Sequence, residues 1–331
     1  MHSCLRPLSF FLGLAPWILA AAVAAQPTPT AVAVSGEFAV SQTAPGGLGQ
    51  NDIDQNGDDG FVVVWESTSL VGDGDRGIAA RRFDDAGQAV GGQFLVNSFT
   101  EFGQYFAGVS YTANGEFLVT WNDSASNPRG QRFAADGSRL GAEFNIDGGT
   151  SGGLEEVRSA ARVDGSFAVA WATTSGSFPD ASPVAARLFQ PDATPATAAT
   201  QVNTATEGRQ FEADITALVN GQFLVAWSNL SASGDELSVR SLTANGLPVG
   251  SQTQVTQASQ GRQAEPSLSA DRADRSVLVW NDSRARILAR RIDSSGALLG
   301  SEFEISQGGP GDRSTPSVAT FRDGGFVVVW T

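Results

Sequence analysis

The stretch Asp323-Gly-Gly-Phe-Val-Val-Val-Trp330 decides the fold, because variants of it recur five more times upstream. The earlier copies end at Trp65, Trp121, Trp171, Trp227 and Trp280. Successive tryptophans are separated by 56, 50, 56, 53 and 50 residues. A fixed period of about 50 residues is typical of a propeller or another repeat array, so the repeat governs how every other feature is interpreted.

Each copy combines a tight turn with an apolar strand. Asp-Gly or Asn-Gly before an apolar run predicts a hairpin, because these residues tolerate the positive φ of the turn. The run that follows is apolar at nearly every position instead of every second one, which predicts a strand covered on both faces. We therefore expect the terminal tryptophans to be buried anchors of the core, with indole N–H groups that need polar partners.

Three further phrases recur between the tryptophan strands. An arginine-containing strand follows each of the first five tryptophans, an alternating strand of the type Gly92-Gln-Phe-Leu-Val-Asn97 comes next, and a weaker strand such as 108–111 precedes each hairpin. Four strands per unit, joined by short turns, predict an antiparallel meander of the size of a propeller blade. The arginine strands lie at 77–83, 129–133, 184–189, 237–242 and 287–292, and the alternating strands at 36–41, 92–97, 142–147, 251–256 and 301–306, with a worn copy at 200–203.

We therefore predict an all-β protein, a β-propeller of about six four-stranded blades over residues 36–331. Only Thr331 follows the sixth tryptophan strand, so the arginine strand of that unit is not in the sequence. Strand 36–41 can complete the last blade from the N-terminal side, yet one strand is still missing. Two interpretations stay open, a three-stranded final blade or a sequence truncated relative to its gene.

The first 25 residues have the features of a secretory signal peptide. Arg6 supplies a positive charge, residues 7–20 are apolar, and small residues at 22–25 offer cleavage sites. The sequence thus predicts a signal peptide (1–25), a short mature N-terminal tail (26–35) and a propeller (36–331). We expect a secreted protein, either extracellular or periplasmic.

The mature chain lacks residue types that many enzymes need. His2 and Cys4 are the only histidine and cysteine, and all 21 basic residues are arginine. Loss of the leader therefore excludes Ser-His-Asp and Cys-His catalysis, Schiff-base lysines and zinc held by histidine or cysteine within this chain. With 35 acidic residues the mature net charge is −15, which disfavours nucleic acid and anionic lipid as partners. We expect a monomer with no nucleic-acid binding and no membrane insertion.

The repeat resembles a known family of sequences. The succession of Asp-Gly-Gly-Phe-Val-Val-Val-Trp, Gly77-Ile-Ala-Ala-Arg-Arg-Phe-Asp84 and Phe94-Leu-Val-Asn97 is similar to the propeller-type tandem repeats of large secreted bacterial surface proteins. Such repeats often accompany calcium-dependent RTX-type adhesins. The resemblance covers residues 36–331 and implies the propeller fold. It brings no catalytic motif and does not identify a ligand.

Binding is expected on the longer, variable loops that share one face, because rigid scaffolds present function on such loops. These loops include 66–76, 122–128, 172–182 and 228–236, and two linking loops carry Gly208-Arg-Gln210 and Gly261-Arg-Gln263. The sequence identifies no catalytic residue and leaves the ligand-binding residues unknown.

The run Asp52-Ile-Asp54-Gln-Asn56-Gly57-Asp58 is the best candidate for a metal site. Alternating carboxylate and amide oxygens followed by glycine are typical of the start of a calcium loop. The predicted ligands are Asp52, Asp54, Asn56 and Asp58. We predict calcium as the ion, because the mature chain offers only hard oxygen ligands. The alternative is an acidic hairpin turn, since Val63 stands where an EF-hand has its glutamate.

One position of the arginine strand is basic in most units, where it is occupied by Arg81, Arg187, Arg240 and Arg290. We expect these side chains to pair with carboxylates on adjacent blades. The alternative is contact with an anionic polysaccharide.

Two classes of function remain. The first is a secreted, non-catalytic propeller that acts as a binding or scaffold module for a protein or glycan ligand. The second is a carbohydrate-active enzyme, a glycosidase or lyase that uses paired carboxylates and needs neither histidine nor lysine. We favour the first class, because no catalytic motif accompanies the repeat.

Overall fold

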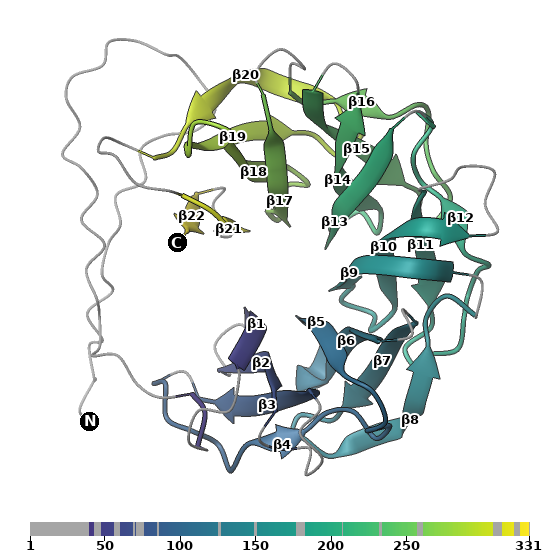
Figure 1. Cartoon of the computed structure of the whole chain (residues 1–331), viewed down its shortest axis with the longest axis vertical. Coiled ribbons are helices and arrows are strands. Elements are labelled where there is room, and N and C mark those ends of the chain that lie inside the picture. Colours follow the sequence, from purple (N-terminus) through teal and green to yellow (C-terminus); the bar gives the residue numbers. More distant parts are fainter. Residues whose placement is uncertain are drawn as a thin grey trace, which may run out of the picture.

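The computed structural model is a ring of six β-sheets, here called blades one to six, around a central axis (Figure 1). It describes residues 40–42, 48–55, 60–68, 70, 76–84, 86–124, 127–148, 151–176, 183–206, 208–231, 234–256, 261–306, 313–320 and 325–330. Within these ranges the only helix is a 3₁₀ turn, η1 (Ala113–Gly115). The predicted fold class, an all-β propeller, is confirmed.

The strands follow one another around the ring in chain order. Blade one contains β1 (Leu48–Gln55), β2 (Phe61–Ser67), β3 (Gly77–Phe83) and β4 (Phe94–Leu95), and blade two contains β5 (Gln104–Tyr111), β6 (Phe117–Asp123), β7 (Pro128–Phe133) and β8 (Arg139–Asn145). Blade three contains β9 (Ser151–Ala161), β10 (Phe167–Gly176), β11 (Val184–Phe189) and β12 (Thr200–Gln201), and blade four contains β13 (Arg209–Ala217), β14 (Phe223–Ser231), β15 (Gly234–Leu242) and β16 (Thr253–Gln254). Blade five contains β17 (Gln263–Ala270), β18 (Ser276–Asp282), β19 (Ile287–Ile292) and β20 (Leu298–Glu304), and blade six contains β21 (Ser317–Thr320) and β22 (Phe326–Val329).

Each blade is an antiparallel meander whose first strand lies nearest the axis (Figure 1). The turn between β5 and β6 contains Asn114 and Gly115, both with positive φ (62° and 75°). This is the backbone conformation that the Asn-Gly pair predicts. Tight turns of this kind lie on one face of the ring, and the longer connections lie on the opposite face, which we call the loop face.

The hydrophobic core lies between neighbouring blades. One cluster joins Val64 of β2 to Val109 of β5 and Trp121 of β6, and further clusters join each later pair of blades in the same way. Trp121, Trp171, Trp227 and Trp280 are fully buried, and Trp65 is nearly so. A strand packed on both faces has no polar side, which is why the tryptophan strands are apolar at successive positions.

Phenylalanines at the start of the second strand and the end of the third strand form a second layer of packing. Phe117 and Phe133 stack with ring centroids 5.0 Å apart, and Phe167 and Phe189 stack at 5.1 Å. Phe61 and Phe83 repeat the pair in blade one at 4.9 Å. These stacks join the second and third strands of a blade near its tight-turn face.

The recurring arginines of the third strands connect the blades, but their acceptors differ from the prediction. Nη1 of Arg187 donates to the carbonyl oxygen of Ile146 (2.9 Å), Arg240 donates to Val202 (2.5 Å), and Arg290 donates to Val255 (2.6 Å). Each acceptor is a backbone carbonyl at the end of the outer strand of the preceding blade. The predicted pairing with adjacent blades is thus correct. The hydrogen-bond acceptors are backbone carbonyls in place of the predicted carboxylates, although the charge of Asp147 on the preceding blade also acts on Arg187.

Blade six shows two of the four strands among the described residues. Its core contacts come from Val318, Phe326 and Val328, which pack against Val277, Val279 and Ala289 of blade five. No helix in the described part of the chain is long and apolar enough to cross a membrane.

Candidate functional site

Six first strands surround the axis and bring polar residues from different blades close together (Figure 1). Pairing with the tryptophan strands defines one equivalent position per blade, opposite the residue that precedes the tryptophan. This position is occupied by Asp52, Gly108, Arg158, Asp214 and Ser267 in blades one to five. We call these residues the axial ring.

Asp52 and Asp54 of β1 connect blade one to blade two. Oδ2 of Asp52 accepts the backbone N–H of Val109 (2.9 Å), and Oδ2 of Asp54 accepts that of Tyr111 (2.7 Å). The Oδ1 atom of each carboxylate accepts the N–H of the residue that follows it in β1. Both oxygens of both side chains therefore have backbone donors.

The same arrangement recurs in other blades with other side chains. Asp214 accepts the N–H groups of Leu268 (2.7 Å) and Ile215 (2.8 Å). In blade five the hydroxyl oxygens of Ser267 and Ser269 accept N–H groups of β21 at 3.2 and 3.1 Å. Because serine and aspartate fill equivalent positions and make equivalent bonds, we interpret these groups as connectors between blades.

Arg158 places a positive charge among the axial carboxylates. Its guanidinium lies 3.3 Å from Glu156 Oε2. Burial disfavours the charged guanidinium, but Glu156, Asp52 and Asp214 together raise the pKa of Arg158 above its ordinary value. Gly108 leaves room for this strand, because a Cβ at that position would lie 3.1 Å from the carbonyl oxygen of Val157.

Burial is the largest influence on the pKa values of the aspartates in the first strands. Burial raises the pKa of Asp54 to about 6, against the opposing effect of its two backbone hydrogen bonds. Burial also raises the pKa of Asp214 to about 6, although Arg158 and two N–H groups act in the other direction. The pKa values of Asp52 and Glu212 are raised for the same first reason. With pKa values of about 6, Asp54 and Asp214 can exchange protons near neutral pH.

The predicted metal ligands are only partly described. Asp52 and Asp54 lie on one face of β1, as the sequence predicts, but Asn56 and Asp58 lie outside the described residues. Within the described ranges no group of three or more acidic, histidine or cysteine residues is arranged to hold a metal ion. Backbone N–H groups satisfy both oxygens of each aspartate without a cation. Calcium at Asp52, Asp54, Asn56 and Asp58 stays a prediction.

A left-handed residue lies within the first strand of three blades and just before the first strand of blade six. Phe106, Glu212, Glu265 and Thr315 have φ values of 60°, 53°, 56° and 48°. A carboxylate of the preceding blade accepts the N–H of three of them: Glu66 binds Phe106, Glu212 binds Glu265, and Glu265 binds Thr315. The carboxylates of Glu66, Glu212 and Glu265 near the loop face are therefore already bonded to backbone N–H groups.

The linking loop between blades one and two carries two exposed aromatic side chains. Phe99 and Phe102 are 39% and 57% exposed, and their ring centroids are 6.5 Å apart. This loop, residues 97–104, aligns residue for residue with 203–210, which link blades three and four, and described residues of the two loops make equivalent hydrogen bonds. Asn97 Nδ2 donates to the carbonyl of Phe99, and Asn203 Nδ2 donates to that of Ala205.

The backbone at Phe102 is strained. Its φ is 69°, and the equivalent residues of the loops before β13 and β17 are Gly208 and Gly261, both at 81°. A bulky residue in this region costs energy that glycine avoids. Phe99 likewise replaces alanine, Ala205, in the corresponding loop. Both phenylalanines thus expose apolar surface, and Phe102 does so in a strained backbone conformation of the kind that clusters at functional positions.

Polar groups flank this aromatic pair. The guanidinium of Arg76 lies 5.6 Å from the ring centroid of Tyr105, and its Nη1 lies 2.8 Å from Oε2 of the buried Glu66. The phenol of Tyr105 lies over Gly103, where a Cβ would come within 2.5 Å of the hydroxyl oxygen. We call Phe99, Phe102, Tyr105 and Arg76 the aromatic patch.

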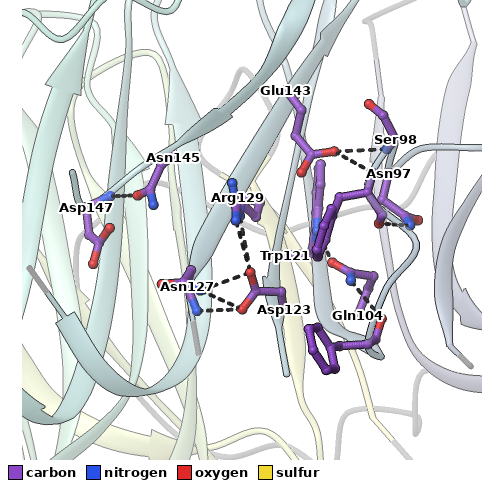
Figure 2. Close-up of polar contacts among 12 residues, drawn as sticks. Asn97, Ser98, Gln104, Trp121, Asp123, Asn127, Arg129, Glu143, Asn145 and Asp147 are labelled. Carbon is purple, nitrogen blue, oxygen red and sulfur yellow. Dashed lines mark hydrogen bonds and ion pairs between the residues drawn. The ribbon is translucent and has the colours of Figure 1, made fainter. Parts of the chain in front are cut away.

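Hydrogen bonds hold the loop in place, as Figure 2 shows for several of its contacts. Oε2 of Glu143, on β8, accepts the N–H of Ser98 (2.9 Å), while Gln104 Nε2 donates to the carbonyl of Phe102 (2.9 Å). Gln104 also accepts the indole N–H of Trp121 at 2.7 Å, so the buried tryptophan fixes the end of the loop. At the adjacent hairpin of blade two, Asp123 binds Asn127 and Arg129. Hydrogen bonds to blade two therefore hold the loop that carries the aromatic patch.

Part of this region can be predicted from the sequence. Loop 66–76 is one of the predicted binding loops, and its residues Glu66 and Arg76 lie at the patch. Phe99 and Phe102 were missed, although aligning the repeats places phenylalanine where other loops have alanine and glycine. In the predicted motifs 208–210 and 261–263 the glutamines are structural, because Gln210 and Gln263 accept indole N–H groups.

Comparisons with known proteins support the fold alone. No protein-family model matches the chain, and no curated protein matches it. A protein of unknown function from Dyadobacter fermentans is similar at 11% identity and a TM-score of 0.60, over 82% of this chain and 87% of that one. An α-L-arabinanase from Penicillium chrysogenum, solved with arabinobiose, is similar at 13% identity and a TM-score of 0.58, over 86% and 88%. A lectin from Aleuria aurantia, solved with a fucose-containing disaccharide, is similar at 11% identity and a TM-score of 0.50, over 85% and 87%. The chain is a β-propeller, the class to which enzymes and lectins among its neighbours also belong.

Proposed function

We propose that this protein is a non-catalytic, carbohydrate-binding propeller and that the aromatic patch is its binding surface. The observation that carries the proposal is Phe102, an exposed phenylalanine in a left-handed backbone conformation where equivalent loops have glycine. The equivalent loops form without an aromatic ring at this position, since they have Gly208 and Gly261 there. A ligand that stacks on the ring of Phe102 would offset the free-energy cost of this backbone conformation.

The chemistry of the patch suits a sugar. The apolar C–H face of a pyranose or furanose ring packs on aromatic rings, while its hydroxyl groups need hydrogen-bonding partners. Tyr105 and Arg76 offer a phenol and a guanidinium beside the phenylalanines, and the loop is fixed in advance, which lowers the entropic cost of binding. The arabinanase and the lectin among the structural neighbours were both solved with saccharides, which supports this ligand class.

The axial carboxylates support a non-catalytic role. Glycoside hydrolysis needs two carboxyl groups free to reach a substrate. Asp52, Asp54 and Asp214 instead use both oxygens for backbone N–H groups of the propeller. The alternative, a carbohydrate-active enzyme, is favoured by the raised pKa values of Asp214 and Glu212, since a general acid needs such a value.

Binding to a glycan array tests the proposal, with Phe102→Gly as the central variant. Glycine relieves the left-handed strain, so the melting temperature should stay unchanged or rise slightly while affinity falls at least tenfold. Phe99→Ala, the residue of the corresponding loop, should also weaken binding. Val163→Ala is the matched control, because Val163 is 96% exposed in a tight turn on the opposite face.

The outcomes separate the two functions. Loss of glycan binding in Phe102→Gly with no turnover of any bound polysaccharide supports a binding module. Hydrolysis or eliminative cleavage that disappears in Asp214→Asn and persists in Phe102→Gly assigns function to the axis instead. Equal binding by the native protein and Phe102→Gly contradicts the aromatic patch.

Export is part of the same proposal. A secreted propeller meets extracellular polysaccharide, and the leader at residues 1–25 is the feature that supports it. N-terminal sequencing of protein from the culture medium or periplasm should give a mature chain that begins near Gln26. Retention of residues 1–25 in the native host would contradict export by cleavage.

A further inference from the structure

A cavity of about 660 Å³ lies between blades one and two on the tight-turn face. Blade one contributes the end of β3 and the turn that follows it, and blade two contributes the turns after β5 and β7. The volume lies within the range of small-molecule pockets, roughly 300–1,000 Å³. The aromatic patch is on the opposite face, so the cavity is a separate site. Its lining includes Arg82, Phe83, Val90, Tyr111, Asn114 and Ala135.

Arg82 reaches from blade one to blade two and brings a positive charge to the cavity. Its Nη1 donates to the carbonyl oxygen of Ala135 at 2.5 Å. Gly137 makes room for the side chain, because a Cβ there would lie 2.9 Å from Nε of Arg82. Arg82 makes no ion pair with a carboxylate of the described residues. A guanidinium has five N–H donors, so most of them are available to a ligand.

The same position of later blades shows how little of Arg82 the fold requires. The pairing of second with third strands aligns Arg82 with Arg132 and Ser241. Arg132 uses its charge in an ion pair with Glu116 (2.9 Å). The hydroxyl of Ser241 donates to the carbonyl of Ser294 at 2.6 Å and so makes the bond between blades without a guanidinium. The cation of Arg82 therefore exceeds what this bond needs.

The amide of Asn114 is a second polar group at the cavity. Asp164 and Asn220 occupy the same position of the turns in blades three and four, where each accepts the N–H of Ser166 or Gln222 at 2.9 Å. Asn114 has a φ of 62° instead, and its exposed amide has no hydrogen-bond partner among the residues that the structure describes. Its donors and its acceptor are thus available at the cavity.

Tyr111 and Val90 supply apolar surface beside these polar groups. The ring of Tyr111 packs edge-on against Phe117, with centroids 5.8 Å apart. Val90 is 40% exposed. Strand pairing places alanine where β5 has Tyr111, so an aromatic ring here is peculiar to blade two among the first five blades with a described residue at this position. The alanines are Ala161, Ala217 and Ala270.

We propose that this cavity binds a small sugar acid, a monosaccharide that carries a carboxylate. The available N–H groups of Arg82 hold the carboxylate, because a planar guanidinium matches the two carboxylate oxygens. The amide of Asn114 bonds a hydroxyl group, and the ring of Tyr111 packs against the C–H face of the sugar. The ligand contacts both blades, so it stabilises the junction between them.

Titration of the full chain with D-glucuronate tests the site, with D-glucose as the neutral control. Glucuronate should give a saturable heat by calorimetry and a melting temperature that rises with its concentration, because it binds the folded state. Glucose should bind at least tenfold more weakly, since it lacks the group that Arg82 holds. Absence of glucuronate binding at millimolar concentration overturns the proposal, as does equal affinity for the two sugars.

Arg82→Ser is the central variant, because Ser241 shows that serine keeps the bond between blades at this position. It should lower the affinity for glucuronate at least tenfold and leave the melting temperature without ligand nearly unchanged. Asn114→Asp keeps a residue type that tolerates positive φ and adds a negative charge beside the carboxylate, so it should weaken binding as well. Native affinity in both variants overturns the proposal.

Two control variants separate this site from other arginines and from the aromatic patch. Arg272→Ser removes an exposed arginine from a tight turn of blade five and should bind glucuronate as the native protein does. Phe102→Gly should also keep native affinity for glucuronate, whatever it does to glycan binding on the loop face. A loss of glucuronate binding in either control overturns the assignment to the cavity.

Discussion

Trp280 donates its indole N–H to Oε1 of Gln263, 17 residues earlier on the first strand of the same blade, at 2.6 Å. Trp121 and Trp227 make the same bond to Gln104 and Gln210. At the equivalent positions of blades one and three the chain has leucine, Leu48 and Leu154. The indole nitrogens of Trp65 and Trp171 are buried and have no partner in the described part of the chain. One first-strand position therefore decides whether a core tryptophan is satisfied.

Leu154→Gln should stabilise the protein. Leu154 pairs with Thr173 in the register in which Gln263 pairs with Asp282, so a glutamine at 154 can accept the indole N–H of Trp171. One added hydrogen bond to a buried donor is worth about 1 kcal/mol. The melting temperature should rise by about 2–4 °C. The reciprocal variant Gln263→Leu should lower it, and an increase in both variants would contradict the argument.

Trp227→Ala should destabilise the fold by about 3–5 kcal/mol, the usual cost of removing a large core side chain. Trp227 is fully buried, lies in the cluster between blades three and four, and donates to Gln210 and Asn229. Trp330→Ala should cost much less, since that side chain is partly exposed. Urea unfolding measures both, and similar midpoints for the two variants would contradict the burial argument.

The tryptophan repeat was enough to predict the propeller because a blade imposes its environment on sequence. A strand packed between two neighbouring blades must be apolar on both faces. Residues 223–227 are all apolar, and alternate residues belong to the cluster with blade three and to the cluster with blade five. The length of the outer strands varies more than the sequence predicts, since β8 and β20 each have seven residues whereas β4, β12 and β16 each have two. The phrase at 92–97 gives only β4, residues 94–95, because regular pairing with the third strand is limited to two residue pairs there.

The partners of polar side chains were harder to predict. Asp52 and Asp54 suggested a cation site because sequence spacing shows neighbouring charges but not the N–H groups of Val109 and Tyr111, 57 residues away. For Arg240 the sequence suggested a carboxylate partner for a similar reason. Every residue has a backbone carbonyl, so residue types do not reveal which carbonyl accepts a hydrogen bond from an arginine. Phe102 is different: its unusual position can be read from the repeats, once it is set against Gly208.

Arg240→Met should destabilise the protein by about 1–3 kcal/mol, because it leaves the buried carbonyl of Val202 without its donor. The guanidinium also donates to Val249 and Gly250, so one side chain joins blade four to the rim of blade three. Arg272→Met, at an exposed turn residue, is the matched control and should be neutral. Equal unfolding midpoints for the two variants would show that the bond between blades contributes nothing measurable.

Acidification from pH 7 toward about pH 4.5 should increase stability through the first strands. Burial raises the pKa of Asp54 from 3.8 to about 6, so the native state binds a proton more tightly than the unfolded chain does. Stability from such a group is fully present below about pH 4 and is lost as the pH rises through about 6. Asp54→Ser removes the titrating group and keeps an oxygen that can accept the N–H of Tyr111, as Ser269 does for Thr320. The slope of melting temperature against pH between 4.5 and 7 should therefore be smaller in Asp54→Ser. An unchanged slope would show that Asp54 does not carry the pH dependence.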